Sequence, residues 1–273
     1  MSEQAESFLG RILAHKRVEV ARQVLKIPLE QLEQHAMAAP PVRDFAAALR
    51  RPDRATLIAE VKKASPSRGV LIEHFDPLAL AHTYAEAGAA AISVLTDVRF
   101  FQGSLKFLDG IRQAQADGRQ VPLLRKDFII DSYQVYEARA YGADALLLIV
   151  AALDDVALRD LLALTHELGM QALVEVHDAA ELDRALEAGA QIVGVNNRNL
   201  HTFATTLETT EQLAARLPAA GRPVLISESG IFTPADVARV RACGADAVLV
   251  GEALVTAPDI AARTRELVVG LEA

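Results

Sequence analysis

The sequence has few of the residues that mark several protein classes. Its single cysteine, Cys243, excludes an internal disulfide and a zinc site built from cysteines. Its seven histidines show no metal-ligand spacing, so we expect no metal site. The formal net charge is −8 and no block of Lys and Arg occurs, so a surface that neutralises nucleic-acid phosphates is not expected.

Long hydrophobic runs are also missing. The longest, roughly residues 145–153, is too short to cross a bilayer. The first ten residues are polar and acidic and lack the apolar region of a secretory signal. We therefore expect a soluble cytoplasmic protein that does not contact membranes. The 273 residues, 51% of them hydrophobic, are enough for one large core.

One local pattern occurs four times along the chain. In each copy a helix-like segment ends at a glycine, an alanine follows, and a short apolar run comes next; the glycines are Gly88, Gly142, Gly189 and Gly244. Glycine suits the position after a helix because the left-handed conformation found there costs it no Cβ clash. The apolar run is typical of a strand buried on both faces. Each copy therefore predicts a helix followed by a parallel strand.

The number of apolar runs indicates the fold. Eight runs occur, near Leu57, Ala91, Pro122, Ala145, Ala172, Ile192, Val224 and Ala247. Helical patterns separate them, among others over residues 77–87, 131–141, 155–168, 179–188 and 234–242. Eight strands alternating with helices predict an α/β fold, a single closed (β/α)8 TIM barrel. A doubly wound open sheet is disfavoured because no G-x-G-x-x-G motif follows the first run.

About fifty residues precede the first predicted strand. Apolar residues recur there at helical spacing from Phe8 to Val24, and Pro40 and Pro41 interrupt the pattern before a further helical stretch at residues 45–49. We interpret residues 1–50 as an N-terminal helical extension packed on the barrel. We expect residues 1–273 to form one barrel domain.

Polar side chains close several of the apolar runs. Glu60 and Lys62 end the first run, Lys126 the third, Glu175 the fifth and Asn196 the sixth. Each alone is more often a solvated strand end. The i, i+2 spacing of Glu60 and Lys62 places both on one face of their strand. Two lysines and two carboxylates at one end of a barrel would be costly to desolvate, and they predict a site of proton transfer.

Glycine turns follow the last two runs. The chain passes through Gly230 and Gly251 directly into helical sequence, where backbone N–H groups can bind a phosphate. The alternative is that these glycines only make tight turns. The loop at residues 63–76 is long for this position, and Ser65, Ser67 and Arg68 are candidate anion contacts. This loop is either a lid or binding segment, or an irregular surface loop.

Several segments resemble the strand-end motifs of the indole-3-glycerol phosphate synthase family. In chain order they are AEVKKASPSRG, SVLTDVRFFQGSL, LLRKDFIID, LVEVHD, GVNNRNL, SESGI and VGEAL, between residues 57 and 254. The resemblance implies an enzyme of tryptophan biosynthesis. Such an enzyme closes the ring of 1-(2-carboxyphenylamino)-1-deoxyribulose 5-phosphate, with loss of CO2 and water, to give indole-3-glycerol phosphate. It implies a phosphorylated small-molecule substrate, no cofactor, and other tryptophan-pathway enzymes as candidate partners.

The resemblance also implies roles for individual residues. Lys126 would be the general acid that protonates the substrate carbonyl, and Glu175 the general base in the dehydration. Lys62 would bind the anthranilate carboxylate and the departing oxygen. Glu60 would orient Lys62 and the substrate hydroxyl, and Asn196 would hydrogen-bond the substrate near the reacting centre. The implied phosphate site contains Ser65, Ser229, Gly230, Gly251 and Glu252, with Arg198 completing the mouth. Glu252 stands where some relatives have Ser or Thr, so only its backbone N–H is expected to contact phosphate. The sequence pattern adds Phe101, Phe128 and Leu200 as an apolar wall for an aromatic ring.

Two other functions compete with this one. The first is another phosphate-binding barrel enzyme, such as phosphoribosylanthranilate isomerase, which uses a cysteine early in its barrel, whereas Cys243 lies late in the chain. The second is a non-catalytic barrel that serves as a partner subunit. The set of Lys62, Lys126 and Glu175 argues against it, because binding alone would not need these groups.

Overall fold

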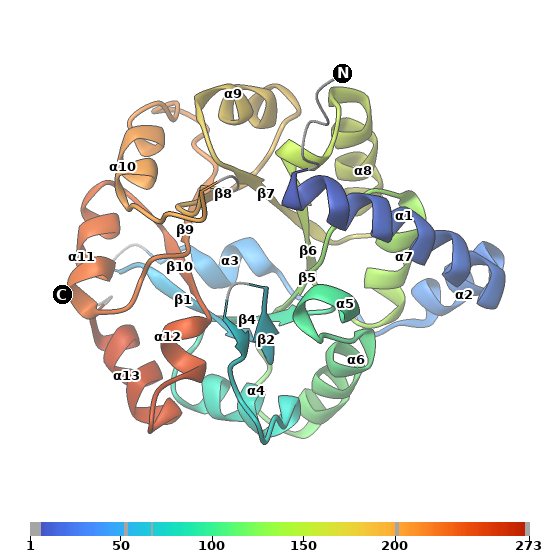
Figure 1. Ribbon diagram of the computed structural model, residues 1–273, viewed down its shortest axis with the longest axis horizontal. Coiled ribbons are helices and arrows are strands. Elements are labelled where there is room, and N and C mark those ends of the chain that lie inside the picture. Colours follow the sequence, from blue (N-terminus) through green and yellow to red (C-terminus); the bar gives the residue numbers. More distant parts are fainter. Residues whose placement is uncertain (1–6, 52–53, 67, 200–201, 271–273) are drawn as a thin grey trace.

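Eight parallel strands close into a barrel in the computed structural model, which describes residues 7–51, 54–66, 68–199 and 202–270. The strands are β1 (Thr56–Val61), β4 (Ala91–Leu95), β5 (Leu123–Lys126), β6 (Ala145–Ile149), β7 (Gln171–Val176), β8 (Ile192–Asn196), β9 (Val224–Glu228) and β10 (Ala247–Val250). Each neighbours the next in chain order, and β1 pairs with both β4 and β10, so the sheet has no free edge (Figure 1). The predicted strands and the TIM barrel are confirmed.

Helices form a ring outside the strands (Figure 1). They are α4 (Pro77–Glu86), α6 (Leu105–Ala114), α7 (Ser132–Ala140), α8 (Asp155–Glu167), α9 (Ala179–Glu187), α10 (Glu208–Ala214), α11 (Pro234–Ala242) and α13 (Ile260–Gly270). Short elements are α5 (Val98–Phe101), α12 (Glu252–Val255), the 3-10 turns η1 (Gln115–Asp117) and η2 (Val150–Ala152), and a hairpin of β2 (Ala64–Ser65) and β3 (Gly69–Val70). The four repeated glycines all have positive φ, as the pattern predicts.

Three helices precede β1. They are α1 (Phe8–Lys26), α2 (Leu29–Ala38) and α3 (Phe45–Leu49). Helix α3 closes the N-terminal end of the barrel, because Phe45 and Leu49 are fully buried against the first residues of the strands, among them Ala91 and Ala145. Helix α1 lies at the opposite end, and its Phe8 lines the cavity there.

The core has two layers. Leu124, Leu147 and Leu173 belong to the cluster that fills the barrel interior, while a larger cluster packs between the strands and the outer helices. Both layers are apolar, which explains why the strand sequences show hydrophobic runs instead of strict alternation.

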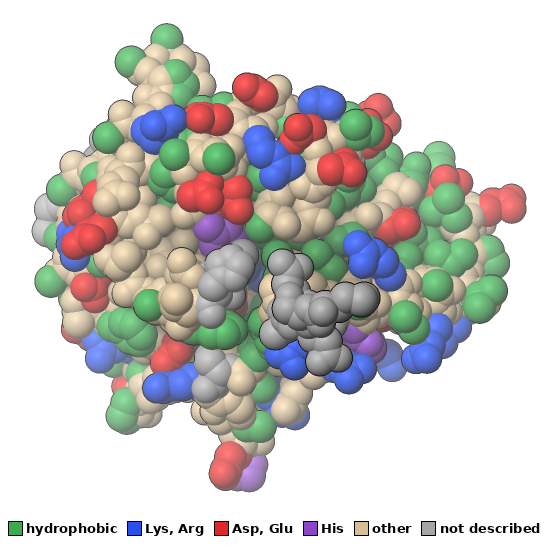
Figure 2. Space-filling model, turned by 45° about the horizontal axis from the view of Figure 1, so that its top comes forward, with side chains coloured by type: hydrophobic (Ala, Val, Ile, Leu, Met, Phe, Trp, Pro, Cys, Tyr) green, Lys and Arg blue, Asp and Glu red, His purple; other side chains and the backbone are tan. Residues whose placement is uncertain are grey.

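Among the described residues, no helix is both long enough and apolar enough to cross a membrane. On the face shown in Figure 2, Lys and Arg side chains are interspersed with Asp and Glu.

Candidate active site

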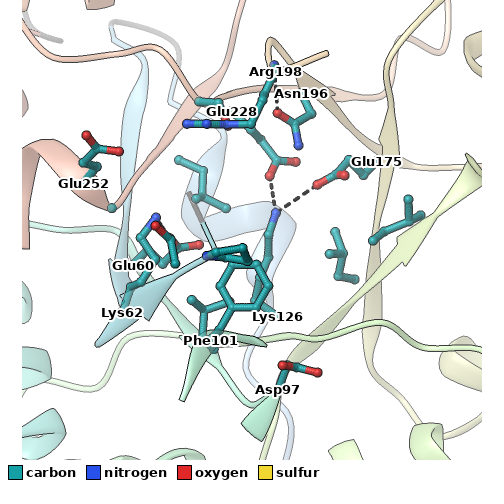
Figure 3. Close-up of a pocket in the computed structure, with 18 of the residues that line it drawn as sticks. Glu60, Lys62, Asp97, Phe101, Lys126, Glu175, Asn196, Arg198, Glu228 and Glu252 are labelled. Atoms are coloured by element: carbon teal, nitrogen blue, oxygen red, sulfur yellow. Dashed lines mark hydrogen bonds and ion pairs between the residues drawn. The ribbon is translucent and has the colours of Figure 1, made fainter. Parts of the chain in front are cut away.

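A cavity of about 220 Å³ opens at the carboxyl ends of the strands. Residues from all eight barrel strands and from the loops after them line it, and α1 contributes Phe8, Leu9 and Ile12. Parallel strands of a barrel all end on one face, so side chains that are far apart in sequence converge there. Figure 3 shows Lys126 near the centre of this pocket, with carboxylates on two sides.

Lys126 contacts two carboxylates at once. Its Nζ lies 3.1 Å from Glu175 Oε2 and also forms an ion pair with Glu228 (Figure 3). Burial alone would lower the pKa of Lys126, but the charges of Glu228, Glu175 and Glu60 outweigh burial and raise it. The side chain is therefore an ammonium group at neutral pH.

The two carboxylates have opposite pKa shifts. Burial would raise the pKa of Glu175, but Lys126 and His177 outweigh burial and lower it. Burial raises the pKa of Glu228 to about 7, and repulsion from Glu175 adds to the effect of burial while Lys126 opposes it. Glu175 is thus the stronger acid of the pair, and Glu228 titrates near neutrality.

Glu60 and Lys62 lie together at the end of β1. Lys62 Nζ is 2.8 Å from Glu60 Oε1, and both side chains line the cavity. The turn after β10 makes room for this pair, because a Cβ at Gly251 would collide with the Glu60 carboxylate and lie 3.0 Å from Lys62 Nζ. Only glycine fits at this position without displacing the pair.

The last two strands lead into narrow turns at the mouth of the cavity. Ser229 and Gly230 have φ of 67° and 79°. A Cβ at Gly230 would press on Thr205. Gly251 is the N-cap residue of the four-residue helix α12, and no side chain caps that helix. Both turns line the cavity, and backbone N–H groups at a helix N-terminus such as that of α12 can bind an anion.

The hairpin after β1 reaches this turn. Arg68 Nη2 lies 3.1 Å from Glu252 Oε1, so the Glu252 side chain forms an ion pair with the 63–76 loop. Ser65 Oγ is buried and has no hydrogen-bond partner among the described residues, and it also lines the cavity. Ser67 lies outside the described residues.

Apolar and polar groups complete the walls. The rings of Phe101 and Phe128 are tilted against each other with centroids 6.2 Å apart. Asn196 accepts a hydrogen bond from the backbone N–H of Arg198 at 3.1 Å, and both residues line the cavity. Leu200, expected on the apolar wall, lies outside the described residues.

Sequence reasoning assigned no role to two charged groups of this region. Glu228 closes β9 and is 2% exposed, and its position at a strand end is the same signal that identified Glu175. Lys16 of α1 is fully buried, with Nζ 2.9 Å from Asp97 Oδ2 and 2.8 Å from Asp127 Oδ1. The sequence feature that could have identified Lys16 is its spacing of four residues from both Ile12 and Val20, which places it on the buried face of α1.

The ion pairs of Lys16 continue through Asp127 to Arg125 of β5. Arg125 Nη2 lies 3.1 Å from Asp127 Oδ2 and 3.1 Å from Glu137 Oε2. Since Lys126 and Arg125 are neighbours on β5, they point to opposite sides of the barrel wall. Among the described residues, no group of three His, Cys, Asp or Glu side chains is arranged to hold a metal ion.

Comparisons with known proteins agree on the fold and the family. Residues 9–267 match the family described as indole-3-glycerol phosphate synthase. The chain is 71% identical over 264 residues to the indole-3-glycerol phosphate synthase of Roseiflexus sp. (strain RS-1), covering 96% of this chain and 98% of that protein. It is 68% identical over 264 residues to the synthase of Roseiflexus castenholzii, with the same coverage.

Solved structures resemble the chain more distantly. A crystal structure of 3-hexulose-6-phosphate synthase superposes with a TM-score of 0.62 at 18% identity, covering 79% of this chain and 99% of that one. Thiamine phosphate pyrophosphorylase from Pyrococcus furiosus gives 0.59 at 17% identity, covering 78% and 93%. These structures share the barrel fold. The isomerase and the non-catalytic subunit, considered above as alternatives, are not the family that the sequence matches.

Proposed function

The chain belongs to the indole-3-glycerol phosphate synthase family, and on that premise we propose a division of roles among the residues of its pocket. As a carboxy-lyase of tryptophan biosynthesis, it acts on a phosphorylated small-molecule substrate. The reaction closes the ring of 1-(2-carboxyphenylamino)-1-deoxyribulose 5-phosphate and releases CO2 and water.

The two ends of the substrate bind to opposite walls of the cavity in this proposal. The phosphate binds at the turns of Ser229–Gly230 and Gly251–Glu252, where backbone N–H groups and glycine conformations favour an oxyanion. Ser65 contributes its buried, unpartnered hydroxyl. The anthranilate ring lies against Phe101 and Phe128, which supply the apolar wall.

Lys126 is the general acid of ring closure. The ring carbon that bears the carboxylate attacks the substrate carbonyl, and Lys126 donates a proton to the carbonyl oxygen as it becomes a hydroxyl. The observation that carries this assignment is the contact of Lys126 with both Glu175 and Glu228 inside the barrel. Those carboxylates keep the ammonium protonated until the substrate arrives.

Dehydration follows loss of CO2. Lys62, held 2.8 Å from Glu60, binds the anthranilate carboxylate and then assists departure of the hydroxyl as water. Glu175 takes the proton that must leave the ring system, and its lowered pKa leaves it ionised for this step. Asn196 and Arg198 hydrogen-bond the substrate at the mouth.

We extend the proposal to the molecule as a whole. Residues 1–273 form one barrel domain with residues 1–50 as its extension, and the chain acts in the cytoplasm. The net charge of −8 and the interspersed surface charges support partners other than nucleic acid or membranes. Other enzymes of the tryptophan pathway are the proposed protein partners.

Lys126→Met tests the central assignment. The variant loses the carbonyl acid but keeps the phosphate turns, so kcat falls by about 10²–10⁴ while substrate affinity changes little. Product indole fluorescence gives a direct assay, because the chain contains no tryptophan. Lys106→Met is the matched control, since Lys106 is exposed on α6. Turnover near the wild-type rate in Lys126→Met would refute the assignment.

A further inference from the structure

His177 lies directly behind Glu175, outside the substrate cavity. Its Nε2 is 3.4 Å from Glu175 Oε1, and among the described residues this buried nitrogen has no hydrogen-bond partner. The side chains of His177 and Glu175 are 10% and 5% exposed. A polar ring nitrogen is therefore buried and directed at Glu175 Oε1, while Glu175 Oε2 contacts Lys126.

The other side of the ring is fixed by Glu181. His177 Nδ1 lies 3.0 Å from Glu181 Oε2, and the same oxygen accepts a hydrogen bond from the backbone N–H of His177 at 2.8 Å. Glu181 sits in the first turn of α9, where Asp178 caps the helix by accepting from the Glu181 N–H at 2.9 Å. The ring is thus oriented by a short, locally anchored arrangement that does not depend on bound substrate.

The groups around His177 favour a positive charge on it. Glu175, Glu181 and Glu228 face it, and the cation Lys126 contacts the other oxygen of Glu175. Burial would lower the pKa of His177, but the hydrogen bond to Glu181 and the charges of these carboxylates outweigh burial and raise it. Glu175 consequently has Lys126 at Oε2 and, at Oε1, a histidine whose surroundings favour the protonated form.

We propose that His177, oriented by Glu181, is a positioning residue that holds Glu175 Oε1 and keeps this carboxylate ionised for the dehydration step. The inference rests on the proposed function, in which Glu175 is the base. The positive charge of His177 is needed because Lys126 loses its proton before Glu175 acts as a base. Once Lys126 has given its proton to the carbonyl oxygen, Lys126 no longer supplies a positive charge to Glu175, whereas Glu228 still repels it.

Without a second cation, burial and the Glu228 charge would together favour protonation of Glu175 when it must act as a base. His177 offsets them from the side away from the substrate. It also leaves Oε2 as the oxygen that faces the cavity. The residue does not touch the substrate, so its effect is expected on the pH dependence of turnover and not on substrate affinity.

The test is the pH profile of kcat for His177→Gln. Glutamine retains a hydrogen-bond donor but not the charge, so the acidic limb of the profile moves upward by about one pH unit. At pH values below the limb, kcat of His177→Gln is about tenfold lower than that of the wild type. At high pH, where wild-type His177 is neutral, the two profiles converge. KM stays within about twofold. His177→Lys, which keeps a cation, restores most of the lost rate at low pH.

Two further variants complete the experiment. Glu181→Gln shifts the limb in the same direction but by less, because His177 remains and only its orientation and charge are weakened. His82→Gln is the matched control; His82 is exposed on α4, and its loss leaves the profile unchanged. An unchanged profile in His177→Gln, or a rate loss equal at every pH, would overturn the proposal.

Glu175→Gln, measured in parallel, separates this inference from the assignment on which it rests. An inactive Glu175→Gln together with a wild-type profile for His177→Gln rejects the role of His177 alone. A Glu175→Gln variant with near-wild-type kcat rejects the role of Glu175 as base, and with it the role of His177.

Discussion

At Glu228, burial and the charge of Lys126 shift the pKa in opposite directions, and burial outweighs the lysine. The Glu228 side chain is buried, Oε2 binds Lys126, and Oε1 has no hydrogen-bond partner among the described residues. Gly194 of the neighbouring strand β8 leaves room for this side chain, because a Cβ at Gly194 would collide with the Glu228 carboxylate. The site therefore accommodates the shape of this group but incompletely stabilises its negative charge.

Replacing Glu228 by Gln should make stability less sensitive to pH. The pKa of Glu228 rises from 4.5 to about 7 on folding, so its stabilising contribution is complete below about pH 4.5 and is lost as pH rises through 7. Over that interval the wild type loses at most roughly 3 kcal/mol from this group, and the glutamine variant does not.

Urea unfolding at pH 5 and pH 8 measures the difference. Glu228→Gln should gain stability over the wild type at pH 8 relative to pH 5, while kcat falls because Lys126 loses one of its two carboxylates. Glu30→Gln, at an exposed position of α2, should show no such pH dependence. An equal stability difference at both pH values would contradict the explanation.

At the scale of elements, the joint between α1 and the barrel depends on one buried lysine. Lys16 bridges Asp97, which follows β4, and Asp127, which follows β5. Burial would raise the pKa of Asp127, but Lys16 and Arg125 outweigh burial and hold it below its usual range. The helix that covers the pocket is thereby tied to the strand that carries Lys126.

Lys16→Met should destabilise the protein by about 3–5 kcal/mol, because it leaves two buried carboxylates short of a cation. The stabilisation of an acid with a depressed pKa is present above its unfolded value and is lost as pH falls, so the deficit should shrink toward pH 3. Thermal unfolding across this pH range measures it. Lys26→Met, at the exposed end of α1, is the control. Equal losses in both variants would mean that apolar contacts alone hold α1.

Local and distant signals explain which elements the sequence could predict. Strand and helix positions depend on neighbouring residues, such as a glycine after a helix and the apolar run behind it, and these were correct. The pairing of Lys16 with Asp127 joins residues more than a hundred positions apart. In the sequence, Lys16 cannot be distinguished from a solvated lysine that interrupts an apolar stripe. His177 was likewise set aside, because a histidine becomes informative only once its two carboxylates are placed in space.

At the scale of the whole molecule, the barrel interior supports the floor of the pocket. Leu147, Ile149 and Leu249 belong to the interior cluster and also line the cavity. Leu173 of the same cluster is fully buried. A Cβ at Gly194 would lie 2.8 Å from Leu173 Cδ1 and would also collide with the Glu228 carboxylate, so Leu173 and Glu228 both pack against this glycine. The position of the charged groups in the pocket therefore depends on how the barrel interior is packed.

Leu173→Ala should consequently affect stability and catalysis together. The closed sheet limits collapse around the lost side chain, so the substitution should cost about 2–5 kcal/mol. For a chain of this length, each kcal/mol corresponds to roughly 2–4 °C in Tm. Leu25→Ala is the matched control, because Leu25 is 86% exposed and surface substitutions usually change stability by less than about 0.5 kcal/mol. If the interior only filled space, kcat at a temperature well below Tm would be unchanged. If it also positions Glu228, kcat should fall at that temperature, because Glu228 forms an ion pair with Lys126, the proposed acid.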